Sequence, residues 1–243
     1  DNRLSLHVGK TESILFGTKQ RLRLAADFSK NCSGEPVQQV NSVVYLGVKL
    51  DQHLSFEEHI VESCDSANSR LSFLYRYSNL LGFPTRKLLC TSLVASKLTY
   101  CISAWYPGLS QGLKARLEVI QRKMVRYVNG WKQRDHVGVQ ETKFLGWLPF
   151  PRRAAQFQLC HLFKVRNGLA PSYLSTGFHR TSSIHQYNTR GSGQNFYADY
   201  LNFPPGTFHY SSVQEWNRLP PELKAITTLP LFKKKLRQLF MSN

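Results

Sequence analysis

The chain has 243 residues, of which 42% are hydrophobic and 12% aromatic, which is enough to bury one or two cores and excludes wholesale disorder. Its 32 Lys and Arg against 15 Asp and Glu give a net charge of +17, which indicates an anionic partner, with nucleic acid as the first candidate. Five cysteines without a C-x-x-C pair, and no apolar run of about 18 residues, argue against a disulfide framework, a zinc knuckle and a membrane span.

The first part of the chain alternates apolar and polar residues, which predicts several short β strands between residues 3 and 51. The alternating apolar positions are Leu4, Leu6, Val8, Ile14, Phe16, Leu22, Leu24, Val44, Leu46, Val48 and Leu50. The segment Asn31 to Pro36 carries Asn, Ser, Gly and Pro and is predicted to be a loop between two strands.

From Ser55 onward the apolar spacing becomes that of helices. Ser55 and Glu58 predict a capping box for a first helix that ends at Gly82. A second helix is expected from about Pro84 to Trp105, and a third from Ser110 to Gly130. The positions expected to be buried are Phe56, Ile60, Cys64, Ala67, Leu71 and Leu74, then Leu88, Leu89, Leu93 and Leu98, then Leu113, Leu117, Ile120, Met124 and Val128. Three helices with short connections favour an antiparallel bundle.

The remainder is predicted to be mixed. An ordered connector (131–151) precedes a helix from Arg153 to Arg166, and residues 171–212 form either a long ordered loop or a few short strands. A last helix (231–240) should expose Lys233, Lys234 and Arg237. The expected fold class is α+β, predominantly α, with short N-terminal β segments, a three-helix bundle and a mixed C-terminal region. The expected domains are 1–54, 55–130 and 131–243.

The acidic residues do not suggest a two-metal enzyme, which needs converging carboxylates, because there is no adjacent pair of Asp residues. Glu57 and Glu58 are adjacent, but they suit the first turn of a helix, where the helix dipole favours negative charge. Cys160 with His161 lacks the two tight pairs of a structural zinc site. We therefore expect no catalytic residue, no metal site and no cofactor in this chain.

The basic residues, by contrast, are clustered. Between Ser110 and Arg153 there are ten basic residues against three acidic ones. The candidates for contacts with nucleic acid are Arg122, Lys123, Arg126, Lys132, Arg134, Arg152 and Arg153. Tyr127 and Trp131 lie near them in sequence and could stack on a base or sugar. The alternative is a solvated basic face with the two aromatic residues in the core.

Several segments together resemble one family. LSLHVGKTESILFG at Leu4–Gly17 and YLGVKLDQHLSFEEHI at Tyr45–Ile60 resemble the end of the palm and the start of the thumb in reverse transcriptases of non-LTR (LINE-type) retrotransposons. Four further segments resemble the region downstream of the polymerase core, in the same order, so that the resemblance covers essentially the whole chain. They are SLVASKLTYCISAW at Ser92–Trp105, LEVIQRKMVRYV at Leu117–Val128, YNTR at Tyr187–Arg190 and VQEWNRLPPEL at Val213–Leu223.

The resemblance implies roles for particular residues. Lys10 matches the motif D lysine, implicated in protonating pyrophosphate or sensing the triphosphate, although His7 stands where the family more often has Asn. Tyr45, Leu46 and Gly47 match the primer grip, a tight β turn against which the 3′ end of the primer is held. The three-helix bundle would correspond to the thumb, which grips the template–primer duplex.

The metal-binding F/Y-x-D-D motif of the family would lie N-terminal to Asp1. The resemblance therefore implies a fragment of an RNA-directed DNA polymerase that is inactive alone, with Mg²⁺ required only by the complete enzyme. The implied partners are an RNA template, an RNA/DNA hybrid and the missing fingers and palm, inside the cell in nucleus and cytoplasm and with no membrane. Two alternatives stay open, namely a non-catalytic basic RNA-binding module and a helical scaffold for protein interactions.

Overall fold

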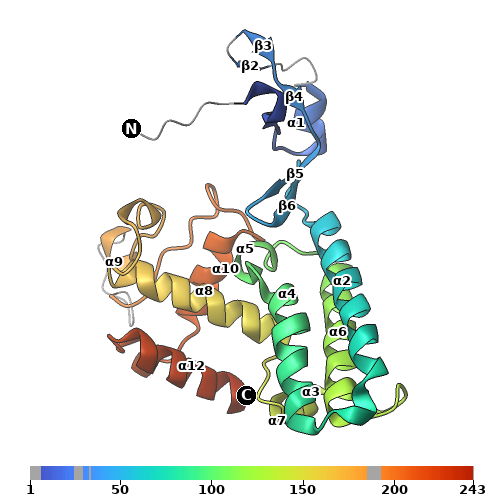
Figure 1. Ribbon diagram of the computed structural model, residues 1–243. Helices are drawn as coiled ribbons and strands as arrows, with labels where there is room; N and C mark the ends of the chain where they lie inside the picture. The colour runs from blue at the N-terminus through green and yellow to red at the C-terminus, as the bar shows by residue number, and fades with distance from the viewer. Residues whose placement is uncertain (1–6, 25–29, 33, 185–192, 243) are drawn as a thin grey trace. The chain divides into compact units, whose positions relative to one another are not determined.

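The computed structural model describes residues 7–24, 30–32, 34–184 and 193–242. Leu4, Leu6 and the YNTR segment lie outside these ranges. The chain divides into two compact units, Asp1–Glu62 and Ser63–Asn243, and the division falls within a helix. About 58% of the described residues are helical and 8% lie in strands, in small sheets near the N-terminus, which confirms the predicted α+β, predominantly α class (Figure 1).

The N-terminal unit is built from short elements. Its described elements are η1 (Val8–Lys10), β1 (Glu12–Ser13), α1 (Lys19–Leu24), β2 (Asn31–Cys32), β3 (Glu35–Pro36), β4 (Gln38–Gln39), β5 (Ser42–Tyr45) and β6 (Val48–Asp51). In the described part they form three two-stranded sheets, with β1 and β4 parallel and the pairs β2–β3 and β5–β6 antiparallel.

Four of the strand and loop predictions are wrong in this unit. Ile14 and Phe16 follow β1 without belonging to a strand. Val8 begins a 3₁₀ helix, and the segment predicted as a loop at Asn31 carries the β2–β3 hairpin. Leu22 and Leu24 lie in helix α1, because long-chain residues with high helix propensity surround them. The hydroxyl of Thr18 accepts a hydrogen bond from the Arg21 amide at 3.4 Å, which caps this helix.

Helix α2 (Glu57–Arg76) carries the predicted apolar stripe except for Phe56, which lies before the helix and is only half-buried. Its buried residues are Ile60, Cys64, Ala67, Leu71 and Leu74. The helix ends at Arg76, earlier than predicted, and a 3₁₀ helix, η2 (Ser78–Leu80), follows.

The second predicted helix is broken into four pieces. They are α3 (Phe83–Leu89), the π-helical η3 (Cys90–Ala95), α4 (Ser96–Thr99) and α5 (Ile102–Trp105). A π turn is wider than an α turn and shifts the phase of the buried face. Leu93, within η3, is therefore exposed, while Cys90 and Val94 are buried. Leu88, in α3 before the π turn, is exposed as well, contrary to prediction. The break before α5 follows from Cys101, whose φ of 51° is left-handed.

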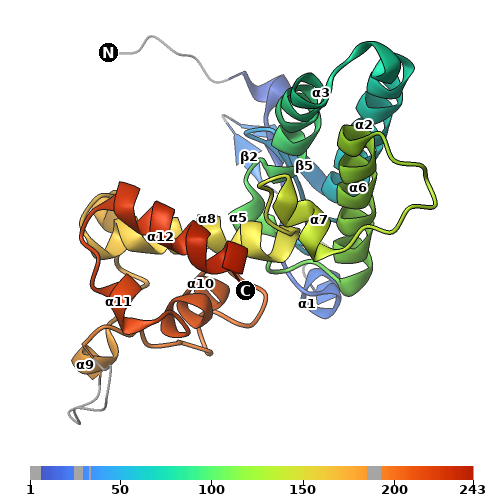
Figure 2. The same ribbon diagram turned by 90° about the horizontal axis from the view of Figure 1, so that it is seen from below.

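The third helix, α6 (Gln111–Asn129), confirms its prediction at both ends. The Ser110 hydroxyl accepts a hydrogen bond from the Leu113 amide, and Gly130 ends the helix with a φ of 71°. The buried face contains Leu117, Ile120, Met124, Val125, Tyr127 and Val128. Figures 1 and 2 show α2, α3 and α6 side by side, as the predicted bundle requires.

The C-terminal region contains more helix than was predicted. Its elements are α7 (Val139–Phe144), α8 (Phe150–Arg166), η4 (Ser172–Leu174), α9 (Thr181–Ile184), α10 (Phe208–Asn217), α11 (Pro221–Lys224) and α12 (Leu229–Ser242). Helix α8 packs against α10 and α12 (Figure 2), around a core that includes Phe163, Trp216, Phe232 and Leu236.

Arg237 corrects one prediction for the last helix. It was expected on the exposed face, but it is half-buried and its guanidinium donates to the carbonyl oxygen of Gly146. The position of Arg237 results from the packing of α12 beside the segment that precedes α8, which the spacing of apolar residues within α12 does not reveal.

Candidate nucleic-acid interface

The hairpin of β5 and β6 carries the residues that resemble the primer grip. Tyr45 pairs with Val48, which leaves Leu46 and Gly47 as a two-residue turn. Both have positive φ, 47° and 79°, which is the pattern of a type I′ turn. This geometry agrees with the tight turn that the resemblance implies. Tyr45 is 64% exposed and Leu46 is 74% exposed, so the tip of the hairpin is apolar and accessible.

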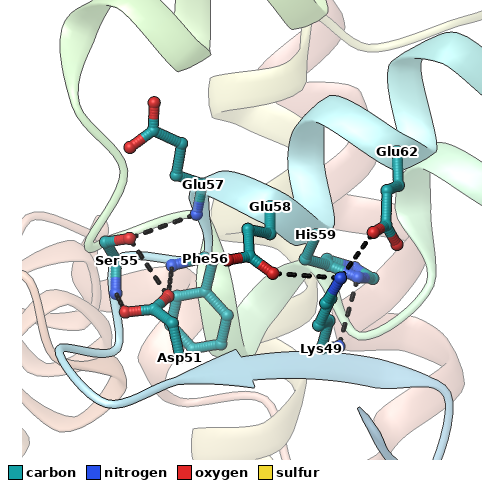
Figure 3. Close-up of polar contacts among 8 residues, drawn as sticks. All are labelled: Lys49, Asp51, Ser55, Phe56, Glu57, Glu58, His59 and Glu62. Atoms are coloured by element: carbon teal, nitrogen blue, oxygen red, sulfur yellow. Dashed lines mark hydrogen bonds and ion pairs between the residues drawn. The ribbon is translucent and has the colours of Figure 1, made fainter. Parts of the chain in front are cut away.

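Asp51, at the end of β6, joins the hairpin to the start of α2 (Figure 3). Its carboxylate accepts hydrogen bonds from the amides of His53 (3.0 Å), Ser55 (3.1 Å) and Phe56 (2.7 Å) and from the Ser55 hydroxyl (3.0 Å). Burial raises the pKa of Asp51, but these hydrogen bonds outweigh it and hold the pKa below 3.8.

The predicted capping box of Ser55 and Glu58 is therefore wrong. The Ser55 hydroxyl does accept from the Glu57 amide at 3.2 Å, but the Glu58 carboxylate pairs with Lys49 on β6 at 3.0 Å. Lys49 also pairs with Glu62, one helical turn later, at 2.6 Å. The two carboxylates, Glu62 more than Glu58, raise the pKa of Lys49. Because the Glu58 carboxylate pairs with Lys49 on β6, it does not bond the backbone amide at the start of its own helix, as a capping box requires.

Lys10, the residue that resembles the motif D lysine, ends η1 and is exposed. Its amide donates to the carbonyl oxygen of His7 at 3.1 Å, and the Thr11 hydroxyl donates to the same oxygen at 3.0 Å. Lys10 thus lies on a turn and not on a strand. Its catalytic role in the family stays a prediction for this chain.

A groove between α2 and α6 brings together part of the basic cluster. Its volume is about 310 Å³, and Leu71 contributes to its apolar surface. Its polar and aromatic lining consists of Asn68, Ser72, Tyr75, Lys123, Arg126, Trp131 and Gln133. We call it the α2–α6 groove. Two cations and two aromatic rings therefore line one concave surface. Proteins that bind single-stranded nucleic acid use this combination of groups.

Both cations of the α2–α6 groove are held by neutral oxygens. Lys123 Nζ donates to Asn68 Oδ1 at 2.9 Å, and Arg126 Nε donates to the carbonyl oxygen of Asp135 at 2.9 Å. Within the described ranges, neither side chain belongs to an ion pair. Each is oriented but keeps an uncompensated charge and further N–H donors, which is what a phosphate contact requires.

The structure separates the other basic candidates from this groove. Arg122 is half-buried on α6 but does not line the groove. Lys132 and Arg134 are exposed on either side of Gln133, in the loop that follows α6. On α8, Arg152 is exposed with its guanidinium carbon 5.3 Å from the centre of the Phe240 ring, whereas Arg153 is half-buried and lines a different cavity.

The two aromatic candidates, Trp131 and Tyr127, differ in their exposure to solvent. Trp131 is 37% exposed and lines the groove, but Tyr127 is fully buried and stacks edge-on against Tyr75, with ring centres 5.1 Å apart. Tyr127 cannot stack on a base. Sequence reasoning missed Asn68 and Tyr75, which lie seven residues apart on one face of α2. Their spacing of seven residues indicates that they share one face of a helix. It does not indicate which other helix that face contacts.

In the described ranges, no set of three or more His, Cys, Asp or Glu side chains is arranged to hold a metal ion. No helix in those ranges has the length and apolar character needed to cross a membrane. Comparison of this chain with protein-family models, with curated proteins and with solved structures found no match.

Proposed function

We propose that this chain binds template–primer nucleic acid as the C-terminal part of a LINE-type RNA-directed DNA polymerase. The observation that carries the proposal is the α2–α6 groove, where Lys123 and Arg126 meet Trp131 without an acidic partner in the described ranges. The order of the family-like segments along the chain and the net charge of +17 support the same function.

In this proposal, the cations of the groove contact backbone phosphates. Lys123 and Arg126 lie three residues apart on one face of α6, so both can reach the same strand. Contacts to phosphate position a duplex without reading its sequence. Trp131 offers a ring face to an unpaired base or a sugar at the edge of the duplex. The apolar tip at Tyr45 and Leu46 would lie against the end of the primer.

The salt dependence of binding tests the groove. In the double variant Lys123→Gln with Arg126→Gln, the slope of log K against log salt on a primed RNA/DNA hybrid should flatten by about two units, because each neutralised phosphate contributes about −0.9. Gln retains helix propensity and can still donate to Asn68. The matched control changes Lys233 and Lys234 to Gln, since both are exposed on α12 and the same charge is lost.

Four outcomes test the proposal against its alternatives. A preference for a hybrid with a recessed 3′ end over single-stranded RNA supports a polymerase fragment. Equal binding to single-stranded RNA would instead favour a basic RNA-binding module without a polymerase role. No salt-dependent binding to either would refute the proposal and leave the helical scaffold for protein interactions. A folded double variant with the wild-type slope would show that the α2–α6 groove is not the surface that contacts phosphate.

A further inference from the structure

A second cavity, which shares no lining residue with the α2–α6 groove, has a volume of about 410 Å³. Its walls come from η3, α4, α6, the segment before α8, and helices α8 and α12. The lining residues with polar groups include Arg153, Arg237, Thr91, Ser96, Thr99 and Trp147. No Asp or Glu lines this cavity in the described ranges. The π-helical η3, a form that is frequent at functional sites, supplies Thr91.

The two arginines of this cavity are half-buried and have no acidic partner. Neither Arg153 nor Arg237 belongs to an ion pair among the described residues. Burial, and then the positive charge of Arg237, lower the pKa of Arg153. Two like charges that are partly removed from water oppose folding unless an anion compensates them.

Both guanidinium groups keep donors for such an anion. Arg237 donates to the carbonyl oxygen of Gly146, and Arg153 Nη1 donates to Gln156 Oε1 at 3.3 Å. The guanidinium carbon of Arg153 also lies 5.0 Å from the centre of the Phe157 ring, which holds the side chain in place. A guanidinium has five N–H donors in a planar fork, and this fork matches the oxygens of a phosphate.

The wall contributed by η3 and α4 has a different chemistry. The hydroxyl of Thr91 donates to the Lys87 carbonyl at 2.7 Å, the hydroxyl of Thr99 donates to the Ala95 carbonyl at 2.9 Å, and that of Ser96 donates to the Ser92 carbonyl. Because these protons are already used, the three oxygens can act only as acceptors toward a ligand. They would accept hydrogen bonds from hydroxyl groups such as those of a sugar.

We propose that this cavity binds a nucleoside monophosphate group, with the phosphate between Arg153 and Arg237 and the ribose hydroxyls against Thr91, Ser96 and Thr99. The cavity volume lies in the range of small-molecule sites, and Trp147 offers an aromatic surface to the base. The group could be a free mononucleotide or the 5′-phosphorylated end of a strand, since both present the same chemistry. The site does not depend on the α2–α6 groove.

Calorimetric titration of the full chain with AMP and with adenosine tests the site. AMP should bind and raise the melting temperature, adenosine should not, and Arg153→Gln should weaken AMP binding about tenfold or more, because a hydrogen-bonded charge is lost. Without ligand, the Arg153→Gln variant should melt no lower than the wild type, since the repulsion from Arg237 is relieved. This separates loss of binding from loss of fold. Lys234→Gln, exposed on α12, is the control and should bind AMP as the wild type does.

A 5′-phosphorylated oligonucleotide, compared with its unphosphorylated form, distinguishes the two sources. A preference for the phosphorylated form supports a strand end as the ligand, whereas binding of AMP without that preference supports a free mononucleotide. The proposal is overturned if AMP fails to bind at millimolar concentration, if adenosine binds equally well, or if Arg153→Gln binds AMP with wild-type affinity.

Discussion

Leu46 adopts a backbone conformation that is unfavourable for a residue with a side chain. It occupies the left-handed region with a φ of 47°, a conformation that costs a residue with a side chain about 1–2 kcal/mol. Gly47, the next residue, adopts its φ of 79° without that cost. Leu46 is 74% exposed, so most of its side chain lies in solvent. Strain of this kind is often found at functional sites, which fits the proposed contact with the primer end.

Replacing Leu46 with Asn should separate stability from function. Asn tolerates the left-handed region, so the Leu46→Asn hairpin should be more stable by about 1 kcal/mol, measured by hydrogen exchange of the β5 and β6 amides. Binding to a hybrid with a recessed 3′ end should weaken, because the apolar tip is lost. Gly47→Ala should instead destabilise the hairpin, since its φ is positive. Unchanged affinity of Leu46→Asn for the hybrid would place the hairpin outside the binding surface.

At the scale of elements, the start of α2 depends on a carboxylate outside the helix. Asp51 satisfies the amides of Ser55 and Phe56, while Lys49 draws Glu58 and Glu62 toward β6 (Figure 3). Charged hydrogen bonds thus join the hairpin to the start of α2. A substitution that destabilises one of them should also destabilise the other.

Asp51→Ala should destabilise this junction by about 1 to 2 kcal/mol at neutral pH, since several amides lose their acceptor. The folded pKa of Asp51 is lowered from 3.8, so its stabilisation is present above that value and disappears as the pH falls through the lower folded pKa. The difference between wild type and variant in hydrogen exchange near Phe56 should therefore vanish in acid. Glu35→Ala, which changes an exposed carboxylate on β3 outside this network, is the control. A difference that persists in strong acid would show that Asp51 acts by packing and not by charge.

At the scale of the whole molecule, basic residues outnumber acidic residues, 32 against 15, which leaves few carboxylates to hold catalytic metal ions. The chain contains no adjacent pair of Asp residues, whereas a polymerase needs carboxylates that hold two metal ions. We expect no nucleotide incorporation by this chain alone on a primed RNA template, with either Mg²⁺ or Mn²⁺. Extension of a labelled primer is the measurement, with a complete reverse transcriptase as the positive control. Incorporation that remains with the chain through every purification step would contradict this prediction.

The sequence alone was sufficient to predict features that depend on neighbouring residues. The ends of α6 follow from Ser110 and Gly130, and its buried face follows from spacing, because capping and helical period act within a few residues. The net charge of +17 needs no fold at all. The second helix was predicted wrongly, because the π-helical turn of η3 shifts the buried face and no local pattern marked it.

The tertiary structure alone decided which basic residues share a surface. Lys123 and Arg126 meet Asn68 and Tyr75 across two helices that are distant in sequence, and Arg153 meets Arg237 from opposite ends of the C-terminal region. Such a site is defined by how helices pack, and packing depends on the shapes of many side chains at once. The spacing of residues along one helix says which side chains share a face. It does not say which face of another helix lies opposite.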